Sequence, residues 1–181
     1  HNVVTIGHLE VRPGTHVAIV GPSGSGKSTL LRALMGWGTS LHHPVSIDGI
    51  PPISISEAWM KRHMAWVPSD INYRIGTASD LYYLGREECD DYESWQDLHL
   101  PEASTPGSHL SDGQLRRISL ARALARHPAI LLLDEPTATL DDEGRRAILA
   151  ALNSFPGTLI VATHDTELAA LCSVVVDLSE S

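Results

Sequence analysis

The sequence predicts an α/β fold with a mostly parallel sheet flanked by helices, and three observations support this. A short apolar strand, Val17 to Val20, ends at a glycine-rich loop that leads into a helix. Two aliphatic runs, AILLL at 129–133 and LIVA at 159–162, have the length and uniform apolar character of strands covered by helices on both sides. A helix is predicted between these two runs, and strands that alternate with helices build a parallel sheet.

The elements of the N-terminal third follow from local patterns. A helix is predicted over 28–35, because leucines recur there at helical spacing until Gly36 ends the run. VSIDG at 45–49 predicts a strand followed by a turn. Ser54 and Glu57 have the spacing of a capping box, so a short helix is expected after them.

The middle of the chain has a different pattern. MAWV at 64–67 predicts a strand that stops at the following proline. Thr77 and Asp80 favour the start of a helix, and the acidic segment 86–98 is interpreted as helical as well. We therefore predict a short inserted helical subdomain in this region.

The C-terminal part returns to the alternating pattern. A helix is predicted after Ser111 because apolar residues mark one of its faces, namely Leu115, Ile118, Ala121 and Leu124. Three acids at 141–143 favour a second helix start, because a helix N-terminus favours negative charge. The predicted domains are a core made of 1–68 and 127–181 and a helical subdomain made of 69–126.

Composition excludes several classes of protein. The 181 residues suffice for one domain, or for one core with a small subdomain. The net charge of −9 has the wrong sign for binding nucleic acid through its phosphates, so no such partner is expected. No stretch approaches the roughly 18 consecutive apolar residues of a membrane span. Cys89 and Cys172 show no disulfide or metal framework and are expected to be free thiols in a reducing compartment.

GPSGSGKS at 21–28 fits the pattern G-x-x-x-x-G-K-[ST] between a strand and a helix. Glycines let successive N–H groups turn toward phosphate oxygens, and the helix N-terminus adds positive potential. Lys27 is expected to reach the β- and γ-phosphates, and the Ser28 hydroxyl to bind Mg²⁺. A glycine turn without function is the alternative, which the strand-to-helix context disfavours. The predicted nucleotide-binding residues are Gly21, Pro22, Ser23, Gly24, Ser25, Gly26, Lys27, Ser28 and Thr29.

Two acids and a histidine follow the two aliphatic strands. Asp134 ends the first strand, placed to hold Mg²⁺ through water, and Glu135 follows as a carboxylate able to orient or deprotonate the attacking water. His164 follows the second strand, where it is placed to donate a hydrogen bond to the γ-phosphate. Glu135, His164 and Lys27 are therefore the predicted catalytic residues. The alternatives are a turn or helix cap for the acids and a structural role for the histidine.

Five motifs in order give the chain a resemblance to the nucleotide-binding domain of ABC (ATP-binding cassette) ATPases over essentially its whole length. They are GPSGSGKST for Walker A, LSDGQ for the signature, ILLLDE for Walker B, TATLD for the D-loop and TH at 163–164 for the switch histidine. The resemblance implies a P-loop NTPase (RecA-like) fold with a small antiparallel β part, and ATP and Mg²⁺ as cofactors. The segment 45–69 looks most like the exporter branch.

The resemblance also implies a role for the signature. In this family the signature of one domain faces the γ-phosphate held by Walker A of a second domain, in a head-to-tail dimer that encloses two ATP molecules. An ordinary helix cap is the alternative for Ser111. The expected partners are a second nucleotide-binding domain, in a homodimer or heterodimer, and a transmembrane domain on the same or another chain. The residues carried over to the contact with the partner's nucleotide are Ser111, Asp112, Gly113, Gln114 and Asp141.

Three features depart from the family pattern. Ser69 stands where the family usually has a glutamine that contacts Mg²⁺ and the membrane domain, so that contact is expected to be lost or passed through water. Asp112 stands where glycine is commonest, and an acid near a γ-phosphate is unfavourable unless it points to solvent. The aromatic residue that stacks on adenine is expected upstream of the first matched strand, before the start of this chain.

The expected function is the motor domain of an ABC transporter at the cytoplasmic face of the membrane. A soluble ABC ATPase that acts on nucleic acid or the ribosome is an alternative, disfavoured by the negative charge and by the lack of coiled-coil insertions or zinc motifs. A degenerate cassette that binds ATP in a regulatory role is the other alternative. Ser69 and Asp112 favour this last interpretation. The residues that argue against it are the intact Lys27, Asp134, Glu135 and His164.

Overall fold

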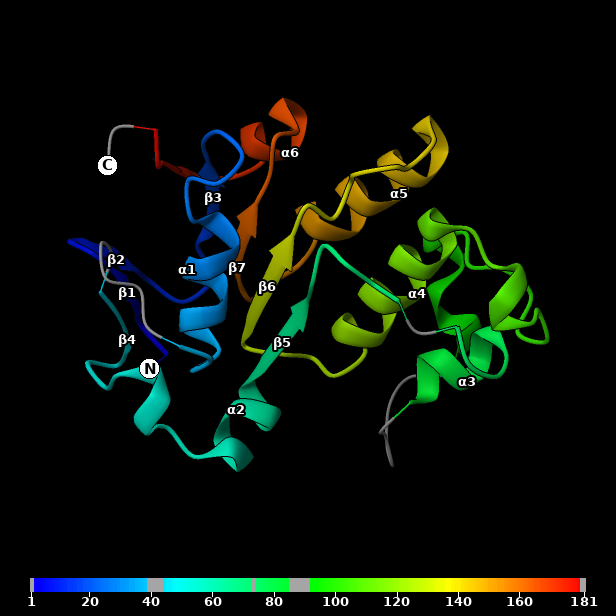
Figure 1. Ribbon diagram of the computed structural model, residues 1–181, viewed down its shortest axis with the longest axis horizontal. Helices are drawn as coiled ribbons and strands as arrows, with labels where there is room; N and C mark the ends of the chain where they lie inside the picture. Colours follow the sequence, from blue (N-terminus) through cyan, green and yellow to red (C-terminus); the bar gives the residue numbers. More distant parts are fainter. Residues whose placement is uncertain (1, 39–43, 73, 85–91, 180–181) are drawn as a thin grey trace. The chain divides into compact units, whose positions relative to one another are not determined.

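The computed structural model describes residues 2–38, 44–72, 74–84 and 92–179 (Figure 1). The strands are β1 (Val4–Ile6), β2 (Leu9–Val11), β3 (His16–Val20), β4 (Val45–Ile47), β5 (Met64–Val67), β6 (Ile130–Asp134), β7 (Thr158–Ala162) and β8 (Val174–Asp177). The α-helices are α1 (Lys27–Leu34), α2 (Glu57–His63), α3 (Ala78–Tyr83), α4 (Asp112–Leu124), α5 (Asp142–Asn153) and α6 (Thr166–Ala170). Three 3₁₀ segments complete the set, η1 (Pro52–Ser54), η2 (Tyr92–Leu98) and η3 (Gly107–His109).

The strands form two sheets. A five-stranded sheet has the order β5-β6-β7-β3-β8, and the pairs β6–β7, β7–β3 and β3–β8 are parallel. A three-stranded sheet has the order β2-β1-β4, and both of its pairs are antiparallel. These two sheets and the helices confirm the predicted fold class, a mostly parallel sheet with helices and a small antiparallel β part.

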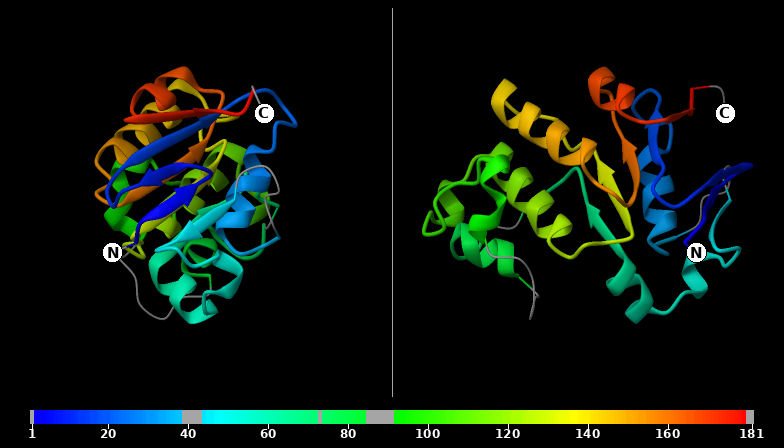
Figure 2. Two further views of the ribbon diagram at one scale, coloured as in Figure 1. Left: turned by 90° about the vertical axis from the view of Figure 1, so that its left-hand side faces the viewer. Right: turned by 180° about the vertical axis from the view of Figure 1, so that it is seen from behind.

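The parallel sheet is the centre of the hydrophobic core. Strands β6 and β7 are buried along their whole length, as their uniform aliphatic sequence requires. Helix α1 packs beside β6 and β7 with its leucines buried. Helix α6 packs next to β3 and can be followed in Figure 1 and in the right-hand view of Figure 2. This packing holds the carboxyl ends of the central strands in a fixed register, and the candidate site lies at those ends.

The chain divides into two compact units. One unit contains 1–66, 128–135 and 156–181 and holds both sheets with α1, α2 and α6. The other contains 67–127 and 136–155 and holds α3, α4 and α5. In this helical unit α4 packs against both α3 and α5. Helix α5 therefore belongs by its contacts to the helical unit, although it lies between β6 and β7 in the sequence.

The expected cap at Ser54 is wrong. Ser54 ends the 3₁₀ segment η1, and the backbone at Ile55 is extended. Helix α2 instead begins after Ser56, whose Oγ accepts a hydrogen bond from Trp59 N at 3.3 Å. Pro51 precedes η1 and Pro52 is its first residue, which favours a short turn at this point, so the next hydroxyl along the chain becomes the cap.

The expected helix over 86–98 is also wrong where the structure describes it. Residues 92–98 form 3₁₀ turns interrupted by non-helical backbone at Trp95 (φ −101°, ψ 37°), and 86–91 lie outside the described residues. Tertiary contacts explain the change, because Trp95 Nε1 donates to Tyr82 Oη at 2.9 Å and Tyr92 Oη donates to the Pro101 carbonyl at 2.7 Å. These contacts outweigh a weak helical pattern.

The other predicted helix starts are confirmed. Thr77 and Asp80 form a complete capping box at the start of α3, and Asp141 caps α5 by accepting a hydrogen bond from Gly144 N at 2.9 Å. The four apolar residues predicted to share one face of α4 are all buried. Within the described part of the chain, no helix has the length and apolar character needed to cross a membrane.

Candidate nucleotide-binding and catalytic site

The phosphate loop joins β3 to α1. Gly21, Gly24 and Gly26 have φ values of 144°, 83° and 97°, a region of backbone conformation that favours glycine. A Cβ added at Gly24 or Gly26 would meet nothing within 4 Å, so glycine is needed there for its conformation and not for lack of space. Gly26 is the N-cap of α1, and no side chain in the described part of the chain caps the first amides of that helix. The loop therefore leaves a helix N-terminus open to an anion.

The lysine and the serines of the loop are held close to its backbone. Lys27 is buried, with 7% of its surface exposed, and its Nζ donates to the carbonyls of Gly21 and Pro22 at 2.8 and 3.0 Å. The hydroxyl of Ser25 is buried without a hydrogen-bond partner among the described residues. Ser28 is half-buried, whereas Pro22, Ser23 and Thr29 are exposed. An ammonium group and an unsatisfied hydroxyl thus accompany the open helix end.

Asp134 comes to the same edge of the sheet as this loop. Its position in β6 pairs with Ala162 in β7, and Ala162 pairs with Ile19 in β3, two residues before Gly21. Asp134 is 2% exposed, and its Oδ2 has no hydrogen-bond partner among the described residues. A buried carboxylate oxygen without a hydrogen-bond donor destabilises the folded chain. A bound cation would satisfy this oxygen, so the position is suited to a metal ligand.

The donors present fit Mg²⁺ bound together with a nucleotide. In the described part of the chain, no three His, Cys, Asp or Glu side chains gather closely enough to hold a metal ion. Asp134 and Ser28 offer oxygen ligands, the type that Mg²⁺ prefers. Because Mg²⁺ is usually held by one or two protein oxygens plus phosphates and water, this small set is sufficient.

Glu135 and His164 are in contact at the ends of β6 and β7. The backbone N–H of His164 donates to Glu135 Oε2 at 3.2 Å, and His164 Nε2 lies 3.3 Å from Glu135 Oε1. Glu135 N donates to the Ala162 carbonyl at 2.9 Å, and Thr163 N donates to the Ile19 carbonyl at 3.1 Å. The backbone of Glu135 has φ 49°, a conformation that a non-glycine residue adopts at a cost. These contacts hold the carboxylate at the sheet edge that carries the loop and Asp134.

The signature residues lie in the helical unit, at the start of α4. Ser111 and Gln114 form a reciprocal capping box, with Gln114 N donating to Ser111 Oγ at 3.1 Å and Ser111 N to Gln114 Oε1 at 2.8 Å. The amides of Asp112 and Gly113 have no partner among the described residues. The cap expected as the alternative role of Ser111 is therefore present, and two adjacent N–H groups remain available to an anion.

The segment before α5 packs against this helix start. A Cβ added at Gly113 would lie 3.1 Å from Leu140 Cδ2, so glycine permits the close approach. Asp141, besides capping α5, has its Oδ1 3.7 Å from Arg117 Nη1 of α4. The D-loop and the signature helix are thereby joined within one chain.

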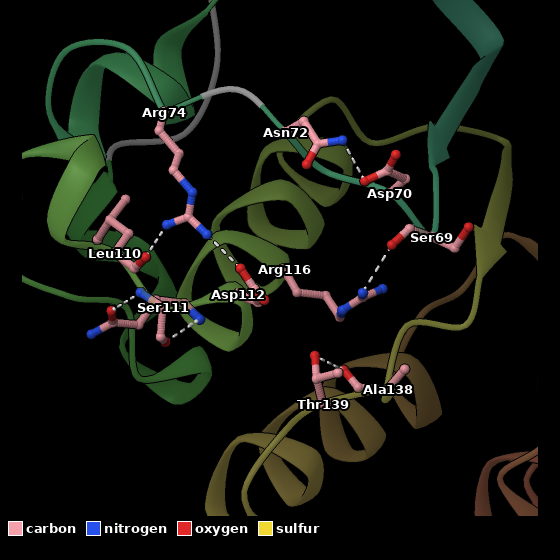
Figure 3. A network of polar contacts seen from close by, with 11 residues as sticks. Ser69, Asp70, Asn72, Arg74, Leu110, Ser111, Asp112, Arg116, Ala138 and Thr139 are labelled. Atoms are coloured by element: carbon pink, nitrogen blue, oxygen red, sulfur yellow. Dashed lines mark hydrogen bonds and ion pairs between the residues drawn. The ribbon is translucent and has the colours of Figure 1, made fainter.

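Ser69 and Asp112 take part in a polar network that Figure 3 shows. The Ser69 carbonyl accepts a hydrogen bond from Arg116 Nη2 at 3.0 Å, while Ser69 itself is exposed. The Asp112 carboxylate pairs with the guanidinium of Arg74, which also donates to the Leu110 carbonyl. Sequence reasoning missed Arg74, because it lies 38 positions from its acidic partner and no local pattern signals such a pair.

The expectation of free thiols is confirmed for Cys172 and lies outside the described residues for Cys89. Burial raises the pKa of the Cys172 thiol to about 11. The group is therefore a neutral thiol at ordinary pH.

A glycine loop between a buried strand and a helix, with an acid at the end of another strand of the same parallel sheet, defines a P-loop nucleotide-binding protein. The family model described as ABC transporter matches residues 5–138. The chain therefore belongs to the ABC transporter family, whose ATP-binding cassettes are P-loop ATPases.

Individual relatives agree with this assignment. An ABC multidrug transporter of Trichophyton equinum is 35% identical over 164 residues, which cover 81% of this chain and 12% of that protein. A probable metal transport system ATP-binding protein of Chlamydia trachomatis is 34% identical over 182 residues, covering 90% of this chain and 75% of the relative. The chain thus spans about an eighth of the length of the fungal transporters that it matches.

Two solved structures have the same fold. A dimeric post-hydrolysis state of an ATP-binding cassette bound to ADP and Pi is 26% identical, with a TM-score of 0.77 over 99% of this chain and 93% of that one. A bacterial Atm1-family ABC exporter with ATP bound is also 26% identical, with a TM-score of 0.82 over 98% of this chain and 37% of that chain. Nucleotide binding is thus a property of the chain's structural neighbours.

Proposed function

We propose that the chain is the ATP-hydrolysing motor domain of an ABC transporter, which closes as a head-to-tail dimer around two MgATP and drives a membrane domain. The observation that carries this proposal is a group of features at the carboxyl ends of the central strands. They are an open phosphate loop, the unsatisfied oxygen of Asp134 and the Glu135–His164 pair. A structural role alone does not account for a buried carboxylate oxygen without a donor beside a loop of free amides.

Binding begins at the loop. The Lys27 ammonium, now on two loop carbonyls, is placed to exchange them for β- and γ-phosphate oxygens. The free amides at the start of α1 bind the remaining phosphate charge. Asp134 and Ser28 would hold Mg²⁺, which would supply positive charge to neutralise the phosphate oxygens. Ser69 is the third residue expected near the metal, through water, and in the structure its carbonyl accepts a hydrogen bond from Arg116.

Hydrolysis depends on Glu135 and His164. The carboxylate of Glu135 orients a water molecule and accepts its proton, while His164 holds that carboxylate in place and donates to the γ-phosphate. Ser111, Gly113 and their neighbours complete the site of a second copy, with Asp141 coupling the two sites. The solved cassette dimer bound to ADP and Pi supports this arrangement.

The partners follow from the relatives. A second cassette and a transmembrane domain, on the same or another chain, are the proposed partners, and the cytoplasmic face of the membrane is the proposed location. The Atm1-family exporter and the multidrug transporters among the relatives favour the exporter branch. The division into an ATP-binding core and a helical subdomain also stays a proposal, in which the helical part carries the signature.

The substitution Glu135→Gln tests the function. It removes the proton acceptor and leaves the loop intact, so the variant is expected to form a dimer in MgATP that sedimentation velocity detects. Glu143→Gln, the same change at an exposed glutamate of α5, serves as the control and should remain monomeric with normal turnover. In the wild type, turnover per chain should rise with protein concentration, because each site needs two chains. A Glu135→Gln variant that stays monomeric at saturating MgATP contradicts the proposal.

A further inference from the structure

The signature helix carries an acid where it is proposed to meet a phosphate. Asp112 is the first residue of α4, and neither its own amide nor that of Gly113 has a hydrogen-bond partner among the described residues. Its side chain is 72% exposed. A negative charge in the first turn suits the helix itself but opposes an incoming anion at the same amides. A bare Asp112 would therefore weaken the contact that the proposed dimer requires.

Arg74 forms an ion pair with Asp112. One side of its guanidinium pairs with the Asp112 carboxylate and the other donates to the Leu110 carbonyl, so a single side chain contacts residues on both sides of Ser111 (Figure 3). The planar fork of arginine can make both contacts at once, which the single ammonium of lysine cannot do in the same geometry. The contact thus places a positive charge beside the acid and gives the Leu110 carbonyl a donor.

The segment that carries Arg74 is itself held in place. Gly107 N donates to the Gly76 carbonyl at 2.7 Å, and a Cβ at Gly107 would lie 2.8 Å from the backbone carbon of Arg74. At the other end of the segment, Arg116 of α4 donates to the Ser69 carbonyl. Arg116 is buried, with 7% of its surface exposed. Described residues on both sides of Arg74 in the sequence, Ser69 and Gly76, therefore have hydrogen bonds to other parts of the helical unit.

We propose that Arg74 is a positioning residue for the signature, which cancels the charge of Asp112 and so lets the amides of Asp112 and Gly113 bind the γ-phosphate of ATP on a second copy of the chain. The inference rests on the proposed function, because it concerns the contact between the two copies. It explains how a signature with an acid in its first turn remains able to bind an anion. It assigns no direct phosphate contact to Arg74.

The test uses the full chain with Glu135→Gln, and measures the ATP concentration that gives half-maximal dimer in the presence of Mg²⁺. Arg74→Ala is expected to raise this concentration about three- to tenfold, because the charge of Asp112 is then uncompensated. Asp112→Asn alone should change it less than about twofold, and the double variant Arg74→Ala/Asp112→Asn should return to within about twofold of the parent. Arg74→Lys should recover only part of the loss.

Two controls separate charge compensation from a general structural effect. Arg62→Ala removes an exposed arginine of α2 and should leave dimer formation unchanged. Binding of a fluorescent ATP analogue to the monomer should be the same in all variants, because it reports on the phosphate loop. If Arg74→Ala does not fold, Arg74→Gln replaces it, since the amide retains a donor for the Leu110 carbonyl without the charge.

The outcomes are distinct. A double variant as weak as Arg74→Ala overturns the inference, since Arg74 would then act otherwise than through Asp112. An unchanged Arg74→Ala variant overturns it as well. If the Glu135→Gln parent does not dimerise in MgATP, the proposed function fails and this inference fails with it.

Discussion

Asp134→Asn is expected to stabilise the ligand-free chain and to weaken its Mg²⁺-dependent binding of ATP. Asp134 is 2% exposed, and one carboxylate oxygen has no donor among the described residues. A buried polar group without a partner costs about 1–3 kcal/mol, and more when it is charged. Replacing the carboxylate by an amide of the same shape keeps the packing and removes the charge. We therefore expect the free energy of unfolding to rise by about 1–2 kcal/mol.

Thermal unfolding without nucleotide measures this change. For a chain of this size, each kcal/mol shifts the melting temperature by about 2–4 °C, so the variant should melt about 2–8 °C above the wild type. Asp177→Asn is the matched control, because Asp177 also ends a strand of the parallel sheet, β8, but is exposed and accepts hydrogen bonds from Ser179. Those bonds lower the pKa of Asp177, so its neutral variant should gain no stability.

MgATP is expected to reverse the order of the melting temperatures of wild type and Asp134→Asn. MgATP stabilises the wild type by mass action in proportion to its affinity, whereas Asp134→Asn, which lacks the metal ligand, should gain much less. A variant that melts at or below the wild-type temperature without nucleotide would refute the reasoning, since Asp134 would then have a satisfying partner in the folded chain. If MgATP raises the melting temperature of the variant as much as that of the wild type, Asp134 is not a ligand of the metal.

Three further predictions concern other parts of the molecule. Gly107→Ala should destabilise the helical unit by about 1–3 kcal/mol, because its Cβ would lie 2.8 and 2.9 Å from backbone atoms of Arg74. Chemical denaturation measures this loss of stability, and a change within about 0.5 kcal/mol would contradict the clash. Hydrogen bonds from the backbone and hydroxyl of Thr77 lower the pKa of Asp80. The contribution of Asp80 to stability is therefore complete above the usual pKa of 3.8 and disappears as the pH falls through the lowered pKa. The difference in unfolding free energy between wild type and Asp80→Asn should vanish in acid, and a difference that grows there would contradict the lowered pKa. Burial raises the pKa of Cys172 from 9.0 to about 11, which lowers its thiolate fraction about 100-fold. In the variant Cys89→Ser, where Cys172 is the remaining cysteine, alkylation at mildly alkaline pH should be slower by that factor than for an exposed thiol. Equal rates would contradict the burial of Cys172.

Several features could be predicted from the sequence because their causes are local. The phosphate loop depends on glycines at fixed spacing between one strand and one helix, and the structure gives those glycines the expected backbone conformations. The capping box of Thr77 and Asp80 and the buried face of α4 follow from residues three or four positions apart. Uniform aliphatic runs identified β6 and β7, since strands buried on both faces have no polar alternation.

Other features were decided only by the tertiary structure. The pair of Glu135 with His164 joins residues 29 positions apart, and the pair of Arg74 with Asp112 joins residues 38 positions apart. The 3₁₀ turns of η2 form because aromatic side chains find hydrogen-bond partners elsewhere in the helical unit. Local propensity and periodicity carry information over only a few residues, whereas these contacts depend on the path of the whole chain. The sequence therefore determined which chemical groups the protein has at its strand and helix ends, and the fold determined which of those groups meet.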